Sequence, residues 1–393
     1  MAERVQHWYP AGARVQRACL PVVMAVLLAA CVSGAGTPVA TPAADTGNGR
    51  AVYRVYVANE SSDIVTRIAF RPGSEPVVEA NTTVGQMPAD IDGPHGLSVS
   101  PDGRFWYVSL AHGTPYGKVW QYATGADTLV GRVELGLFPA SLAVAPDGQF
   151  LYVVNFNLHG DHVPSSVSVV FTPTMTEIAR PATCTMPHGS RLDATGTRHY
   201  STCMMDDQLV ELDARRFAVS ARFSLAPGAE HLLPEAGHAH GPMTTPACSP
   251  TWAQPGAGSR ARLVYVACNR RDEILEIDTE QWRVTRRFAT GRAPYNLAVT
   301  PRGDLLLATL KGAQALAVFD LQTGRELGRV ATSESVTHGV LVTPDGRYAF
   351  VTNESRGMAR GTVDVIELAT LRRVGSARVA RQPGGIDFWP GGG

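Results

Sequence analysis

The chain has 393 residues and carries 35 basic and 35 acidic side chains, so its formal net charge is zero. This balance gives no support to a nucleic acid or an anionic membrane surface as the main partner. Glycine (39 residues) and proline (27) are plentiful, and 18% of the residues are charged, which is typical of an all-β protein with many tight turns.

The N-terminus has the features of an export signal. Basic residues precede an apolar run at 19–30, which is too short for a comfortable membrane span. The run ends in Leu-Ala-Ala-Cys at 28–31, which resembles the bacterial lipobox, in which the cysteine is lipidated and becomes the mature N-terminus. With Val32 next, resemblance to Gram-negative lipoproteins implies that Cys31 is anchored in the outer membrane, facing the periplasm. An ordinary signal peptide followed by a chance cysteine, or an uncleaved anchor, is the alternative.

The chain divides into three parts on this basis. Residues 1–30 form the predicted lipoprotein signal peptide. Residues 31–50 are small, polar and rich in proline and glycine, which predicts a flexible tether. Residues 51–393 form the predicted folded domain.

Seven short motifs recur along 51–393, at intervals of 43 to 63 residues. They begin at Pro94, Pro139, Pro187, Pro250, Pro294, Thr337 and Pro383. In most units an apolar strand follows the motif, a turn of the Pro-Asp-Gly type follows that strand, and a second apolar strand comes next. A repeat of this size and pattern predicts a four-stranded propeller blade.

The two ends of the domain are expected to build one blade together. Residues 383–389 supply a single inner strand before the chain stops, and 53–70 with 76–84 supply the strands that it lacks. Such sharing closes the ring and removes open sheet edges. We therefore predict an all-β, seven-bladed β-propeller with one blade closed by N- and C-terminal strands. We number that blade first. An open solenoid or two separate domains is the alternative, which the interlocking ends argue against.

Three tetrapeptides resemble the YVTN family of propeller repeats. They are Tyr-Val-Ala-Asn at 56–59, Tyr-Val-Val-Asn at 152–155 and Phe-Val-Thr-Asn at 350–353. The resemblance implies a propeller fold and does not imply one function, because such propellers serve as binding surfaces, enzymes and cofactor holders.

Histidines gather at one end of the predicted ring. First strands start there and second strands finish there, and we call it the motif end; nine of the eleven histidines map to it. Three of these histidines occupy the second position of a motif, and a glycine follows each of them. They are His95, His188 and His338. They should therefore line the channel at one depth, where three imidazoles suit a transition metal. The alternative is three channel histidines that each bond to a neighbouring carbonyl.

A long insertion at 226–247 is a second candidate region. His231, His238 and His240 lie in it and would add metal ligands from above the channel mouth. A polar surface loop without metal is the alternative. Thioether ligands beside imidazoles favour copper, and methionines occur at this end of the ring at positions 186, 204, 205 and 243. We therefore expect a transition metal, with copper favoured.

The stretch Pro-His-Gly-Leu-Ser-Val-Ser-Pro-Asp-Gly at 94–103 resembles the histidine–glycine strands of the nitrous oxide reductase propeller. In that enzyme copper is held at the channel end. The match is local, and that enzyme's further histidines and separate copper domain have no counterpart, so its activity is not implied. The sequence has no phosphate-binding loop, no G-x-S-x-G and no C-x-x-C-H. We expect neither a nucleotide cofactor nor a c-type haem.

Four cysteines occur in the folded domain. Cys184 and Cys203 flank the first two strands of the fourth blade, and Cys248 and Cys268 repeat this arrangement in the fifth. Neighbouring antiparallel strands would bring each pair together, so we predict disulfides 184–203 and 248–268, as export would permit. Thiolate ligation of copper is the alternative.

The sequence supports two main hypotheses of function. The first is an envelope lipoprotein whose propeller binds a copper-like metal or a redox ligand through the histidines of the motif end. The second is a non-catalytic scaffold for an envelope protein partner. A lactonase-like hydrolase is a weaker third reading, based on propellers of similar repeat length. In each case the membrane is reached through Cys31 and no nucleic acid is expected.

Overall fold

The computed structural model describes residues 51–86, 90–112, 117–234 and 245–392. The predicted signal peptide (1–30), the tether (31–50) and the lipidated Cys31 lie outside the described residues. The described part contains 29 strands and three short 3₁₀ helices. No helix in it has the length and the hydropathy of a membrane span.

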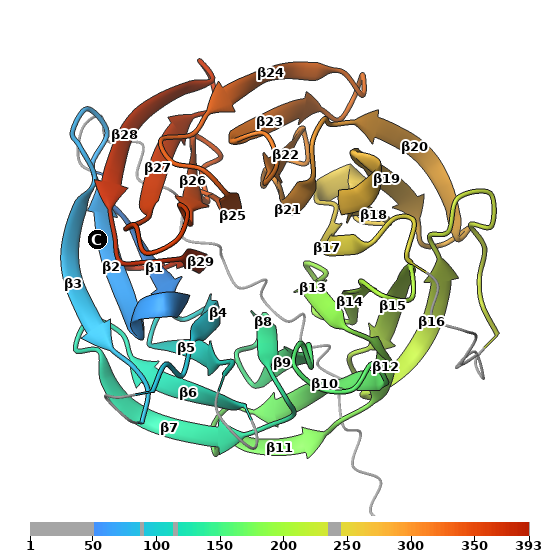
Figure 1. The fold of residues 1–393 in the computed structure, drawn as a ribbon, viewed down its shortest axis with the longest axis horizontal. Helices are drawn as coiled ribbons and strands as arrows, with labels where there is room; N and C mark the ends of the chain where they lie inside the picture. Colours follow the sequence, from blue (N-terminus) through green and yellow to red (C-terminus); the bar gives the residue numbers. More distant parts are fainter. Residues whose placement is uncertain (1–50, 87–89, 113–116, 235–244, 393) are drawn as a thin grey trace, which may run out of the picture. The chain divides into compact units, whose positions relative to one another are not determined.

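Seven sheets stand around a central channel, so the predicted seven-bladed propeller is confirmed (Figure 1). The predicted closure is also confirmed. Blade 1 combines β29 (Pro383–Phe388) with β1 (Tyr53–Asn59), β2 (Ile64–Phe70) and β3 (Val77–Thr83). Strands β29 and β1 pair antiparallel, with Tyr56 opposite Asp387.

Each other blade is built from consecutive strands that run outward from the channel. Blade 2 contains β4 (Pro94–Val99), β5 (Phe105–Leu110), β6 (Lys118–Ala123) and β7 (Thr128–Glu134). Blade 3 contains β8 (Pro139–Val144), β9 (Phe150–Asn155) and β10 (Pro164–Phe171), with its outer edge split between β11 (Thr176–Ala179) and β12 (Ala182–Thr185). Blade 4 contains β13 (Pro187–Leu192), β14 (Arg198–Cys203), β15 (Gln208–Asp213) and β16 (Ala218–Ser224).

Blades 5 to 7 complete the ring. Blade 5 contains β17 (Pro250–Pro255), β18 (Leu263–Cys268), β19 (Glu273–Asp278) and β20 (Arg283–Ala289). Blade 6 contains β21 (Pro294–Val299), β22 (Leu305–Leu310), β23 (Ala315–Asp320) and β24 (Glu326–Ala331). Blade 7 contains β25 (Thr337–Val342), β26 (Tyr348–Asn353), β27 (Thr362–Glu367) and β28 (Arg372–Arg378). The 3₁₀ helices are η1 (Glu60–Ser62), η2 (Gly258–Arg260) and η3 (Asn269–Arg271).

The core lies between neighbouring blades, because each sheet packs its faces against the next. Tyr265 and Phe288 of blade 5 pack in one buried cluster with Phe319 of blade 6. The second strands are therefore buried on both faces; in β18 every residue is buried. This explains why these strands are runs of apolar residues without a polar alternation.

A left-handed residue precedes every motif. Its φ lies between 46° and 65° in all seven blades, at Gly93, Phe138, Met186, Ser249, Ala293, Val336 and Gln382. Directly after it, the pairing of the first two strands shifts register; in blade 2, Pro94 faces Leu110, and the next pair is Leu97 with Val108. The two residues between are released from the ladder, which is how the second motif position comes to face the channel.

Buried side-chain donors bridge six of the seven steps between blades. In each step the acceptor is the carbonyl oxygen of the second motif residue of the next blade. The bridges are Ser109 to Ala140, Ser141 to His188, His188 Nδ1 to Thr251, Thr251 to Tyr295, Thr309 to His338 and Thr352 to Gly384. At the seventh step, a Cβ on Gly385 would lie 2.5 Å from the carbonyl oxygen of His95, so only glycine fits there.

Both predicted disulfides are confirmed. Cys184 is bonded to Cys203 and Cys248 to Cys268, with Cα–Cα distances of 5.8 and 4.5 Å. The four cysteines are thus used in cross-links, so the alternative of thiolate ligation does not apply to this state. The two bonds indicate an oxidising compartment, and hence an exported protein.

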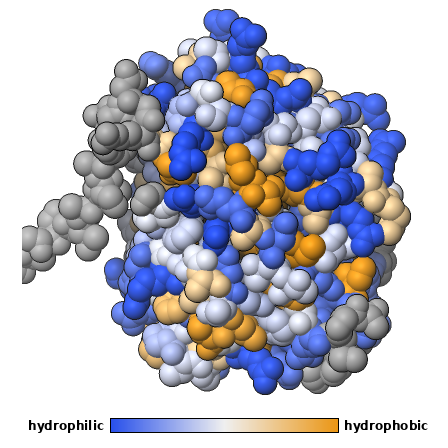
Figure 2. Space-filling view, turned by 90° about the vertical axis from the view of Figure 1, so that its left-hand side faces the viewer, coloured by the Kyte–Doolittle hydropathy of each residue, from blue (hydrophilic) through white to orange (hydrophobic). Residues whose placement is uncertain are grey.

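The outer rim is polar with scattered apolar side chains, as one side view shows (Figure 2). Exposed apolar residues on outermost strands include Val77, Leu129, Ile178, Leu327 and Val374. They lie on different blades, and scattered apolar residues of this kind are ordinary on a protein surface.

Candidate functional site

The three predicted histidines do meet in the channel. His95, His188 and His338 line a single cavity of about 430 Å³, a volume that includes its opening into the channel. The ring centroid of His95 lies 6.0 Å from that of His188 and 6.2 Å from that of His338. Since the second motif position faces the channel in each blade, the repeat spacing was sufficient to place them together.

The residue that follows each second strand forms another ring at the motif end. Its seven members are Glu60, Ala111, Phe156, Met204, Asn269, Lys311 and Glu354. Glu60, Lys311 and Glu354 carry charge, and our sequence analysis did not select them. The signal was present, because Glu60 and Glu354 each follow the asparagine of a YVTN-like tetrapeptide.

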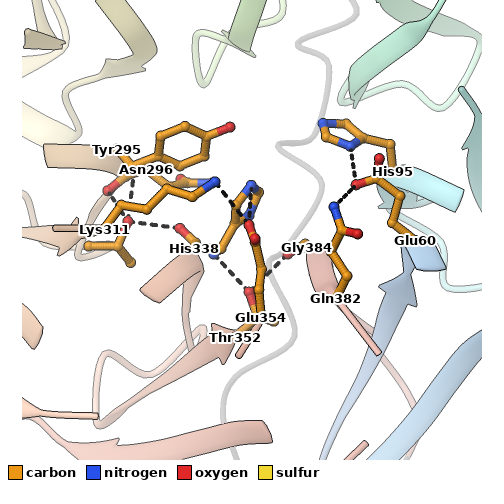
Figure 3. Close-up of polar contacts among 12 residues, drawn as sticks. Glu60, His95, Tyr295, Asn296, Lys311, His338, Thr352, Glu354, Gln382 and Gly384 are labelled. Carbon is orange, nitrogen blue, oxygen red and sulfur yellow. Dashed lines mark hydrogen bonds and ion pairs between the residues drawn. The ribbon is translucent and has the colours of Figure 1, made fainter. Parts of the chain in front are cut away.

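Glu60 is the buried centre of a cluster of polar side chains on one side of the channel (Figure 3). Its carboxylate accepts hydrogen bonds from His95 Nδ1 (2.9 Å) and Gln382 Nε2 (3.0 Å), which Figure 3 shows. It also accepts one from His112 Nε2 (2.8 Å). Burial acts to raise the pKa of Glu60, but the charge and hydrogen bonds of the two imidazoles outweigh it and hold this pKa well below its usual range. Burial acts to lower the pKa of His95, and the Glu60 carboxylate more than reverses this, so the pKa is raised.

Gly93 allows His112 to join this cluster. A Cβ at position 93 would lie 2.0 Å from Cδ2 of the His112 ring, and the residue has a φ of +65°. A larger residue would therefore displace the imidazole and adopt a strained backbone conformation.

A second charged group faces the first across the channel (Figure 3). Lys311 Nζ lies 3.0 Å from Glu354 Oε1, and the same oxygen lies 3.4 Å from His338 Nε2. The Lys311 ammonium also sits 4.3 Å from the centroid of the Tyr295 ring, a cation–π contact. Burial and the Lys311 charge hold the pKa of His338 well below its usual range, so this imidazole is neutral.

His188 is fixed by hydrogen bonds at both nitrogens. Its Nδ1 donates to the carbonyl oxygen of Thr251 (3.0 Å), which leaves Nε2 to accept from the Tyr295 hydroxyl (3.2 Å). Burial, with a contribution from the His95 charge, lowers the pKa of His188 to about 3. It is a neutral imidazole whose tautomer is set by the blade-to-blade bridge.

An apolar and aromatic group lies beside the Glu60 cluster. Phe138 packs edge-on against His95, His112 and His159, at centroid distances of 5.5, 5.0 and 5.4 Å. It belongs to a buried cluster with Ala111, Ala140 and Phe156, against which Met186 and Met204 pack. Met186 and Met204, two of the methionines predicted at this end, thus fill space beside the histidines; Met243 lies outside the described residues.

The insertion does not join this group within the described residues. His231 is exposed, and its carbonyl oxygen accepts from the backbone of Ser224 on the outer strand β16. The neighbouring Glu230 is ion-paired with Arg287. His238 and His240 lie outside the described residues.

No preformed metal site is found in the described ranges, since no group of three or more His, Cys, Asp or Glu side chains there is arranged to hold an ion. The channel end places three imidazoles around one cavity, with two carboxylates, an ammonium and a phenol in contact with these imidazoles or with one another. Such a set can bind a metal, exchange protons or hold a polar ligand.

Comparisons with known proteins support the propeller fold and give no information about the channel site. No family model matches the chain. An 80-residue segment is 34% identical to Antigen Lp49 of Leptospira interrogans serogroup Icterohaemorrhagiae serovar copenhageni (strain Fiocruz L1-130), which covers 18% of each protein. The match therefore spans less than a fifth of that relative's length.

Three solved structures share the architecture. A functionally unknown protein from Desulfotomaculum acetoxidans DSM 771 has a TM-score of 0.64 at 13% identity, with 85% of this chain and 98% of the other covered. A putative 6-phosphogluconolactonase from Bacteroides fragilis NCTC 9343 has a TM-score of 0.62 at 15% identity, with 86% and 98% covered. Kuenenia stuttgartiensis hydrazine synthase has a TM-score of 0.55 at 19% identity, with 73% and 82% covered. At these identities the likeness establishes a propeller fold and nothing about activity.

Proposed function

We propose that this chain is an exported, lipid-anchored propeller of the YVTN-repeat type that binds a transition-metal ion, copper in the first place, through His95, His188 and His338. One observation carries the proposal. Each of the three imidazoles is approached at one nitrogen by an outer partner, namely Glu60, the Thr251 carbonyl and Glu354 respectively. Metal-ligating histidines are held in this way, because the outer partner fixes the ring and raises the basicity of the other nitrogen.

The inner nitrogens support the same reading. Nδ1 of His338 is buried and has no hydrogen-bond partner in the described part of the chain. The hydrogen bonds of His95 within that part involve its Nδ1, which leaves Nε2 for a ligand. Nε2 of His188 accepts a single long hydrogen bond from the Tyr295 hydroxyl, which an incoming ion would displace.

The spacing of the rings is close to what a shared ion requires. Metal–nitrogen bonds are about 2 Å long, so two imidazoles on one ion have centroids about 5 to 6 Å apart. The observed 6.0 and 6.2 Å are at the upper end. Because the described residues hold no closed ligand group, the proposal requires the three side chains to move closer together on binding.

Metal analysis tests this proposal directly. The mature protein would be stripped with a chelator and titrated with Cu(I), Cu(II) and Zn(II). We expect about one equivalent of copper per chain in the native protein, and a large loss of affinity in His338→Ala. The matched control is His162→Ala, which removes an exposed histidine from a loop at the same end. Sub-stoichiometric metal that is indifferent to the channel substitution would refute the proposal and leave the interaction scaffold as the better hypothesis.

The lipid anchor needs its own test. We expect metabolic labelling with a fatty acid to mark the native protein, and Cys31→Ser to abolish the label and release the protein from the outer-membrane fraction. A labelled Cys31→Ser variant would show that Cys31 is not the lipidated residue. The lactonase-like alternative rests on fold likeness alone at 15% identity, and no observation at the site favours it.

A further inference from the structure

An arginine points into the same cavity from deeper in the channel. Arg191 lies on β13, three residues after His188, and lines the cavity together with Trp252 and Asn296. Its guanidinium sits 4.5 Å from the centroid of the Trp252 ring. Burial lowers the pKa of Arg191 to about 10, so the side chain is charged at neutral pH.

The charge of Arg191 has no direct counter-ion in the described residues. Its hydrogen bond goes from Nη1 to the carbonyl oxygen of Ser190 (3.0 Å), and no carboxylate there lies within 4.0 Å. The carboxylate whose charge acts on the pKa of Arg191 is that of Asp387. That carboxylate already accepts from Val99 N (2.8 Å), Ser98 Oγ (3.2 Å) and Phe388 N (2.8 Å). Most of the five guanidinium donors are thus left for another partner.

Two further polar atoms of the cavity walls are buried without a hydrogen-bond partner among the described residues. They are Nε1 of Trp252 and Oδ1 of Asn296, on residues that are 7% and 5% exposed. Buried polar atoms are rarely left unpaired, because each costs free energy. The oxygen and nitrogen of an asparagine amide are assigned and not observed, so a flip would turn a donor of Asn296 toward the same space.

We propose that this cavity binds a small planar oxyanion of the carboxylate class, with Arg191 as its main ligand. A guanidinium holds two coplanar oxygens with paired N–H donors, which a lysine does not do. No Asp or Glu lines the cavity to repel an anion. The indole N–H of Trp252 and the amide of Asn296 are suitable additional donors.

The size of the cavity limits the ligand. The space that the centre of a water-sized group can occupy is only about 30 Å³, roughly enough for two waters. Formate and bicarbonate are of about this size, and each presents two coplanar oxygens. This site goes beyond the metal site proposed above and does not depend on it, because Arg191 and Trp252 are not among the proposed metal ligands.

Titration of chelator-stripped protein with ¹³C-formate and with bicarbonate, followed by NMR line broadening and calorimetry, tests the proposal. We expect saturable binding to the native protein, and at least a tenfold weaker association in Arg191→Gln. The matched control is Arg216→Gln, which makes the same change at a side chain of blade 4 that is 83% exposed and should leave binding unchanged. Equal binding in all three proteins, or no saturable binding to the native protein, would overturn the proposal.

Two further variants guard against a folding defect. Asn296→Asp is nearly isosteric and places a negative charge beside the guanidinium, so formate binding should be lost while the circular dichroism spectrum and the melting temperature stay close to native. Arg191→Lys keeps the charge but not the paired donors, and should bind more weakly than native. Formate binding that survives Asn296→Asp would contradict the assigned cavity. Because metal is absent throughout, failure here is separate from failure of the metal titration.

Discussion

The hydroxyl bridges between blades predict a specific loss of stability in Thr352→Val. Thr352 is fully buried. Its Oγ1 accepts from the Gly339 N–H (2.7 Å) and donates to the Gly384 carbonyl (3.0 Å). The pairing of β25 and β26 shifts between Thr337 and Val340, so the Gly339 N–H depends on this hydroxyl.

The size of the effect follows from the two backbone groups that valine leaves behind. Valine matches the shape of threonine but bonds to neither group, and an unsatisfied buried donor or acceptor costs about 1–3 kcal/mol. We therefore expect Thr352→Val to lower the free energy of unfolding by about 2–4 kcal/mol. Thr352→Ser keeps the hydroxyl and loses one methyl group, so it should cost about 1 kcal/mol.

Chemical denaturation of the disulfide-intact protein, followed by circular dichroism and tryptophan fluorescence, measures both variants. The midpoints should shift at an unchanged slope. Thr370→Val is the matched control, because Thr370 is exposed and the same change there should cost less than about 0.5 kcal/mol. If Thr352→Val is as stable as Thr352→Ser, the hydroxyl does not hold the blades together, and the reasoning about the other bridges fails with it.

Three further predictions concern single features. His199 is buried with neither ring nitrogen bonded in the described residues, and burial lowers its pKa to about 3. The free energy of unfolding should therefore fall as pH drops from about 6.5 toward 3, by about 2 kcal/mol at pH 5. Acid denaturation of His199→Phe should show a smaller fall. If His199→Phe loses as much stability on acidification as the native protein, the pH dependence does not arise from His199. Replacing Cys184 and Cys203 by alanine removes a cross-link between residues 19 apart in the sequence. The free energy of unfolding should fall by about 3 kcal/mol in the same denaturation assay. An unshifted midpoint would show that the bond is dispensable. Gly93→Ala would clash with His112, so the imidazole NMR signals of His112 should shift; unchanged signals would contradict the described contact.

The fold was largely predictable, because a propeller repeats its signals. The spacing of the motifs gave the number of blades, and the incomplete last unit, Pro383 onward, identified the shared blade. The two disulfides followed from the same reasoning, since Cys184 lies just before the first strand of blade 4 and Cys203 ends the second strand, which pairs with the first. Such features are local or periodic, so a single sequence contains them.

The site was only partly predictable. His95, His188 and His338 share a motif position, and the repeat alone placed them together. Glu60, Lys311 and Glu354 share a position too, after the second strand, but their residue types differ from blade to blade, so the pattern does not single them out. Arg191 was missed for another reason. Its lack of a counter-ion depends on side-chain contacts across the channel, which no spacing in the sequence records.

A diffraction experiment on crystals grown with copper tests the central claim most directly, with anomalous data collected at the copper edge. The account predicts one strong anomalous peak in the channel, within about 2 Å of a ring nitrogen of each of His95, His188 and His338. The outer contacts of His95 with Glu60 and of His188 with the Thr251 carbonyl should be retained. A channel without anomalous density, or copper bound only at the protein surface, would contradict the account.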